Sequence, residues 1–167
     1  WNSRSWHWDL EQIREAGITE NVVELMAGKI QQLPTTTKAV LQLAACIGNR
    51  FDLRTLALVY KNPQHETLED LWPALQEELV VPLGDEYKYI TGKKRNGSAA
   101  LRGGDFKFLH DRVQQAAYSL ITEEHKQEIH LQIGRLLLSN LSEAERDERL
   151  FEIVDHFNAG KTLLSEQ

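Results

Sequence analysis

The stretch FKFLHDRVQQAAYSLI, residues 106–121, changes its hydrophobic pattern part of the way along. Its first residues alternate apolar and polar side chains, as a short strand does. From residue 113 onward, apolar side chains recur at helical spacing, at Val113, Ala116, Ala117 and Leu120. His110 and Asp111 fall where one pattern gives way to the other. We therefore expect a strand-to-helix junction that carries an imidazole and a carboxylate.

Two further β-prone segments precede this junction. They are LVVPL at 79–83 and YKYI at 87–90, separated by the turn-forming residues GDE. The next segment, 91–105, is rich in glycine and basic residues and predicts a long loop. Together the three short strands predict a hairpin followed by a third strand at 106–109.

Helical patterns come before these strands. One apolar stripe runs from Val22 to Leu33 and stops at Pro34, and a second runs from residue 40 to 47 and stops at Gly48. Asp52 is placed as the N-cap of a helix over 53–60. Thr67 and Asp70 resemble a capping box for a third helix, with Pro73 near its start. Trp72 lies on the apolar stripe of that helix, and we expect it in the core.

Three helices, a hairpin and a third strand predict a winged-helix domain at 34–110, whose wing loop is 91–105. Residues 1–33 form a helical segment before it. Residues 111–167 are expected to form three C-terminal helices, one of them beginning at a capping box of Ser142 and Glu145. Two of these helices resemble the start of a helical-repeat array. The predicted fold class is mainly α with a small β-wing, in which helices flank the winged-helix domain.

Composition excludes several classes of protein. The net charge is -6 and the hydrophobic fraction is 41%, which is ordinary for a soluble globular protein. Cys46 is the only cysteine, so no disulfide framework can form. No signal peptide or membrane-spanning run is visible. We expect a cytoplasmic chain without membrane contact, and its abrupt ends suggest a piece of a longer protein.

DNA binding is not expected, although winged helices often bind DNA. The third predicted helix, ETLEDLWPALQEEL, contains no lysine or arginine and several carboxylates. Such a helix would be repelled by the phosphate backbone that a DNA-binding helix must neutralise. The wing residues Lys93, Lys94 and Arg95 are basic. They could contact a phosphate or an acidic partner, or they could belong to a solvated loop.

Three other chemistries are possible interpretations of these histidines and aspartates. His65, His110, Asp111 and Asp155 occur in the order used by metal-dependent His-Asp phosphohydrolases, but that family carries its His-Asp pair within a helix. The letters HDR superficially resemble the phosphoacceptor motif of a histidine kinase, but a strand pattern precedes them. His125 and His130 are five residues apart, so they do not share a helix face as a zinc pair would. No metal site is predicted.

Several long blocks together resemble a known family. NVVELMAGKIQQLP, VLQLAACIGNRFDL, LWPALQEELVVPL, FLHDRVQQAAYSL and HLQIGRLLL are similar to a region of large bacterial signalling proteins. Those proteins join a serine/threonine kinase domain to a predicted AAA-type ATPase of the STAND class. GAF, PAS and histidine-kinase modules often follow. The resemblance covers residues 8–164, and it places residues 1–33 at the end of the ATPase lid.

The resemblance implies a regulatory role for the winged helix. In that family the domain packs on the ATPase core, and a histidine at the end of its last strand commonly reaches the ADP phosphates. The tripeptide methionine-histidine-aspartate marks this place in related regulators, and here it reads Leu109-His110-Asp111. His110 and Asp111 are therefore the predicted phosphate-sensing residues. The alternative is that His110 is a packed, hydrogen-bonded residue at a strand end.

Catalytic motifs are absent from the sequence. There is no Walker A pattern, no kinase glycine-rich loop, no His-Arg-Asp loop and no Asp-Phe-Gly. We therefore expect no catalytic residue and no cofactor in this chain, with ADP or ATP and Mg²⁺ bound by the parent protein. The expected partners are an intramolecular ATPase core and downstream signalling domains. The alternative function is a protein-interaction or transcription-regulatory module without a nucleotide link.

Overall fold

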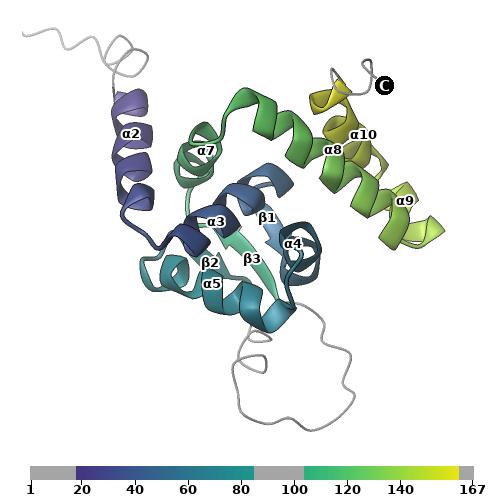
Figure 1. The fold of residues 1–167 in the computed structure, drawn as a ribbon, viewed down its shortest axis with the longest axis horizontal. Helices are drawn as coiled ribbons and strands as arrows, with labels where there is room; N and C mark the ends of the chain where they lie inside the picture. Colours follow the sequence, from purple (N-terminus) through teal and green to yellow (C-terminus); the bar gives the residue numbers. More distant parts are fainter. Residues whose placement is uncertain (1–17, 85–103, 162–167) are drawn as a thin grey trace, which may run out of the picture.

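A computed structural model describes residues 18–84 and 104–161. These ranges form helices and a small sheet in the order α2 (Ile18–Gln31), α3 (Thr35–Ile47), β1 (Arg50–Asp52), α4 (Leu53–Tyr60), α5 (Gln64–Gln76), β2 (Val80–Pro82), β3 (Asp105–Phe108), α7 (Asp111–Ser119), α8 (Glu123–Asn140), α9 (Glu143–Glu148) and α10 (Leu150–Ala159). The prediction of a mainly α chain with a small β-wing is confirmed (Figure 1).

The sheet has three antiparallel strands in the order β1-β3-β2. Phe51 of β1 lies opposite Phe106 of β3, and Val80 of β2 lies opposite Phe108. The Phe51 and Phe106 rings stack with centroids 5.9 Å apart, and Phe108 lies 5.7 Å from Phe51 in a tilted arrangement. All three rings are buried, so they join the sheet to the helical core.

The core lies between the sheet and the helices α3, α4 and α5. Val40, Leu41, Leu53, Leu56 and Leu71 are completely buried there. Asp52 caps α4 as predicted, because its carboxylate accepts hydrogen bonds of 2.7 Å from the backbone N and the hydroxyl of Thr55. The remaining helices pack around this unit, with α2 against α7 and α10 against α8 (Figure 1).

Three predictions about α5 are wrong. The helix begins at Gln64 rather than at a Thr67–Asp70 capping box, and the Thr67 hydroxyl donates to the Pro63 carbonyl at 3.0 Å. Pro73 therefore lies in the last turns of the helix. Trp72 is not a core residue, since 40% of it is exposed. The inward face of the helix contains Leu68 and Leu71, as the stripe predicts, and Ala74, but not Trp72.

Other boundaries also differ from prediction. β1 was not predicted, and the last strand runs from Asp105 to Phe108. β2 pairs with β3, while the predicted strand at 87–90 lies outside the described residues. The capping box of Ser142 and Glu145 is present, but the helix that follows breaks at Arg149 into α9 and α10. Within residues 18–84 and 104–161, no helix is long and apolar enough to cross a membrane.

Candidate functional site

His110 occupies the predicted junction between β3 and α7. It is the N-cap residue of α7 and has an extended backbone (φ -140°, ψ 149°). Its carbonyl accepts a hydrogen bond of 2.9 Å from the backbone N of Val113, which fixes the start of the helix. The side chain is exposed and makes no capping hydrogen bond. Among the described residues no hydrogen bond occupies the imidazole, so the ring is available to a ligand or to a packed partner.

Asp111 follows in the first turn of α7, where a carboxylate is favoured by the helix dipole. It accepts a hydrogen bond of 2.9 Å from the side-chain amide of Asn49. The Asn49 carbonyl also accepts from the backbone N of Phe108 at 3.0 Å. Asn49 thus joins the end of α3, the end of β3 and the start of α7. In this arrangement Asp111 is oriented by Asn49 and not by His110.

Asn49 is a site residue that the sequence reasoning missed. It lies 62 positions before Asp111, directly after the helix-ending Gly48. Its only sequence signal is its place in a Gly-Asn turn, which is typical of many loops without function. The predicted wing contacts Lys93, Lys94 and Arg95 lie outside the described residues.

The arrangement of the described residues does not support the alternative of a metal-dependent His-Asp phosphohydrolase. In the described parts of the chain, no three His, Cys, Asp or Glu side chains converge as metal ligands. His65 is exposed on α5, with its Nε2 3.8 Å from the carboxylate of Glu66. Cys46 is buried, and burial raises the pKa of its thiol to about 12, which is unsuited to a nucleophile.

A second polar cluster, also missed by the sequence reasoning, joins α7, α8 and α10. The Nδ1 atoms of His130 and His156 are 2.8 Å apart, and the Tyr118 hydroxyl lies 3.0 Å from Nε2 of His130. A consistent assignment has Tyr118 donating to His130 and His130 donating to His156. His125, by contrast, is exposed and lies 3.2 Å from Glu128. We refer to Tyr118, His130 and His156 as the histidine cluster.

Burial controls the charge of the histidine cluster. Burial and the neighbouring His130 lower the pKa of His156 to about 4. Burial and the Lys126 ammonium lower the pKa of His130. The Lys126 ammonium lies 4.6 Å from the centroid of the Tyr118 ring, a cation–π distance. Both imidazoles are therefore neutral at neutral pH, and the cluster holds the C-terminal helices together without a buried charge.

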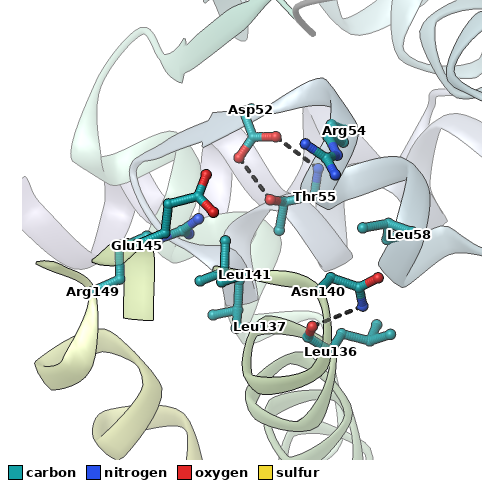
Figure 2. Close-up of a pocket in the computed structure, with 10 residues that line it drawn as sticks. All are labelled: Asp52, Arg54, Thr55, Leu58, Leu136, Leu137, Asn140, Leu141, Glu145 and Arg149. Atoms are coloured by element: carbon teal, nitrogen blue, oxygen red, sulfur yellow. Dashed lines mark hydrogen bonds between the residues drawn. The ribbon is translucent and has the colours of Figure 1, made fainter. Parts of the chain in front are cut away.

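A cleft of about 180 Å³ separates α4 from α8 and α9 (Figure 2). Its lining mixes apolar side chains, Leu58, Leu136, Leu137 and Leu141, with polar ones that include Arg54, Asn140 and Glu145 (Figure 2). Arg149 also borders it, but its guanidinium already makes bonds of 2.8 and 2.6 Å to the carboxylate of Glu152. Asp52 and Glu145 are engaged as helix caps. The polar groups of the cleft are thus mostly occupied by structural bonds.

Comparison with known proteins gives one curated relative. No protein-family model matches the chain. The hybrid signal transduction histidine kinase G of Dictyostelium discoideum is 29% identical to it, in a match that covers 97% of this chain and 6% of that protein. The chain is therefore similar to one small segment of a signalling kinase. A solved structure, an organohalide-sensing transcriptional regulator in its 2,4-dichlorophenol-bound form, aligns over 93% of this chain and 86% of its own, at 16% identity and a TM-score of 0.36.

Proposed function

We propose that this chain is a regulatory, non-catalytic segment of a multidomain signalling kinase, in which His110 senses the phosphates of ADP bound to a STAND-type ATPase core. The observation that carries the proposal is the exposed His110 imidazole at the N-terminus of α7, which no described residue occupies. Similarity to a segment of a hybrid signal transduction histidine kinase supports the signalling context.

The chemistry of the junction suits a phosphate. The first backbone N–H groups of a helix are unpaired and carry positive partial charge, so an anion near them is stabilised. An imidazole N–H can donate one more hydrogen bond to a phosphate oxygen. The Asp111 carboxylate accepts its hydrogen bond from Asn49, and no described residue is hydrogen-bonded to the His110 imidazole, so the ring can meet a ligand from outside the chain.

The proposed mechanism is a shift between two conformations. In the closed form, His110 contacts the ADP phosphates on a core packed against β3 and α7. Exchange of ADP for ATP removes the contact of His110 with the ADP phosphates, which exists only in the closed form. The population of molecules then shifts towards an open form. Mg²⁺ and the nucleotide belong to the parent protein, where the core would bind them.

The test uses a longer protein that includes the upstream ATPase core. The nucleotide that copurifies with the wild type and with His110→Ala is identified by mass spectrometry, and its release rate is measured. One charge-assisted hydrogen bond contributes roughly 1.5–3 kcal/mol, so we expect release at least about tenfold faster from the variant. His65→Ala removes another exposed imidazole, on α5, and serves as the matched control. Equal rates of nucleotide release from wild type and His110→Ala would refute the proposed contact between His110 and the ADP phosphates.

A second candidate function is a protein-interaction module without a nucleotide link. The observation that favours it is the exposed face of α5, where Trp72 is 40% exposed and lies one turn after the exposed carboxylate of Glu69. An aromatic ring beside a carboxylate can bind cationic side chains of another protein, whereas the carboxylate repels DNA. Loss of a partner on Trp72→Ala, with unchanged nucleotide release in His110→Ala, would favour this candidate.

A further inference from the structure

The last helix of the described chain presents large apolar side chains to solvent. Phe151 is 86% exposed, Leu150 is 51% exposed and Val154 is 43% exposed. On the neighbouring helix α8, Leu138 is also 43% exposed. We call these four residues the α10 patch. An apolar stripe of Leu150, Ile153, Val154 and Phe157 predicts burial, but of these four only Ile153 and Phe157 turn towards α8, where Ile153 is buried and Phe157 is partly buried.

Helix geometry places Leu138 in the same patch as the residues of α10. Close approaches join Gly134 to the ring of Phe157, and Gly160 to Leu131, so α8 and α10 run antiparallel. Leu138 lies one turn after Gly134, which brings it beside the part of α10 one turn before Phe157. That part contains Val154. Leu150, Phe151 and Val154 lie along one exposed side of α10, and exposed apolar surfaces of this kind mark sites of protein association.

The charged side chains that flank Phe151 along α9 and α10 are acidic. The hydrogen bonds from Arg149 N to Glu145 O and from Ile153 N to Arg149 O continue the helical spacing across the break between α9 and α10. Asp147 and Glu148 therefore lie about one turn before Phe151, and Asp155 lies one turn after it. All three are exposed.

Two arginines lie near the patch. Arg135 is exposed and lies one turn before Leu138 on α8, away from Phe151. Arg149, on the side of Phe151, does not offset the carboxylates there. The Arg149 guanidinium is held by Glu152 through two bonds, of 2.8 and 2.6 Å. Exposed carboxylates around an apolar surface attract cationic side chains and repel anionic ones, and this arrangement selects among partners with the same apolar face.

We propose that the α10 patch is the docking surface for an amphipathic helix of a partner protein that carries lysine or arginine beside its apolar face. Phe151 would be the central anchor, because it is the most exposed and largest of the four side chains. The apolar stripe of the partner would cover Leu150, Phe151 and Val154. Its basic residues would meet Asp147, Glu148 and Asp155. This surface is separate from the His110 junction, and its test involves no nucleotide.

The test uses two synthetic helical peptides with the same leucine and tryptophan stripe. One carries lysine at all remaining positions and the other carries glutamate. Binding to the 167-residue chain is measured by fluorescence anisotropy at low and high salt. We expect the lysine peptide to bind, the glutamate peptide not to bind, and affinity to fall as salt screens the charges. Phe151→Ser should weaken binding of the lysine peptide at least about tenfold, as expected for a central anchor.

Two variants make the result specific. Leu25→Ser changes a side chain on α2 that is 65% exposed, and it should leave binding unchanged. The double variant Asp147→Lys and Glu148→Lys should reverse the preference between the peptides. Equal binding to the wild type and to Phe151→Ser would overturn the proposal. So would a concentration-dependent dimer of the wild type that Phe151→Ser abolishes, because the occupant would then be a second copy of this chain.

Discussion

His130 of α8 and His156 of α10 are in contact as neutral imidazoles, so we expect the folded chain to lose stability in mild acid. The Nδ1 atoms of His130 and His156 face each other at 2.8 Å, so only one of them can carry a proton in this contact. The pair can accept one extra proton at most before the contact breaks. The charged groups nearest to His156 are Glu152, Arg149 and Asp155, and they partly offset one another.

The size of the effect follows from the pKa of His156. Burial lowers this pKa to about 4 in the folded chain, whereas an unfolded histidine has a pKa of about 6.5. The folded state therefore gains stability from neutral His156 above about pH 6.5, and this contribution is lost as the pH falls towards about 4. Between about pH 7.5 and about pH 5, linkage gives a loss of about 2 kcal/mol in the free energy of unfolding.

Urea unfolding followed by circular dichroism at the two pH values tests this prediction. His156→Gln removes the titrating group, so the difference in unfolding free energy between the two pH values should shrink by about 2 kcal/mol. His125→Gln removes an exposed imidazole that lies beside Glu128, and it should leave the difference unchanged. If the wild type and His156→Gln lose the same stability on acidification, the reasoning from burial is refuted.

Three further predictions concern the helices. A Cβ added at Gly160 would lie 3.0 Å from the Cβ of Leu131, so Gly160→Ala should lower the free energy of unfolding by about 1–3 kcal/mol. Gly28 lies on α2 with open space around it, so Gly28→Ala should raise the free energy of unfolding by up to about 1 kcal/mol. Asp52→Ala removes both bonds to Thr55, and its cost should be about 1–2 kcal/mol in chemical denaturation. A change below about 0.5 kcal/mol, the ordinary scatter of surface substitutions, would contradict either loss.

Local chemistry made several elements predictable. Pro34, Gly48 and Asp52 end or begin helices where the sequence places them, because proline lacks a donor, glycine adopts unusual dihedral angles and aspartate accepts from free N–H groups. The capping box of Ser142 and Glu145 is present for the same reason. The junction at His110 also follows from the change of pattern in its own segment.

The errors arose where burial depends on partners far away in the chain. Trp72 shares an apolar stripe with core residues, but the packing of α5 against α3 and α4 buries Leu68, Leu71 and Ala74 and leaves Trp72 40% exposed. β1 has only three residues and no periodicity, and it exists because β3, more than 50 positions later, supplies its hydrogen bonds. The pattern within one segment does not show which distant segments will pack against α5 or pair with β1.

The same division applies to the candidate site. The residue types and their order place His110 and Asp111 at a strand-to-helix junction, because strand and helix periodicities are local properties. The bond from Asn49 to Asp111 and the contact between His130 and His156 depend on packing of segments 62 and 26 positions apart. The exposure of Phe151 likewise depends on which face of α10 meets α8. Tertiary packing alone determines these features, since it chooses which of the apolar and polar faces written in the sequence are buried.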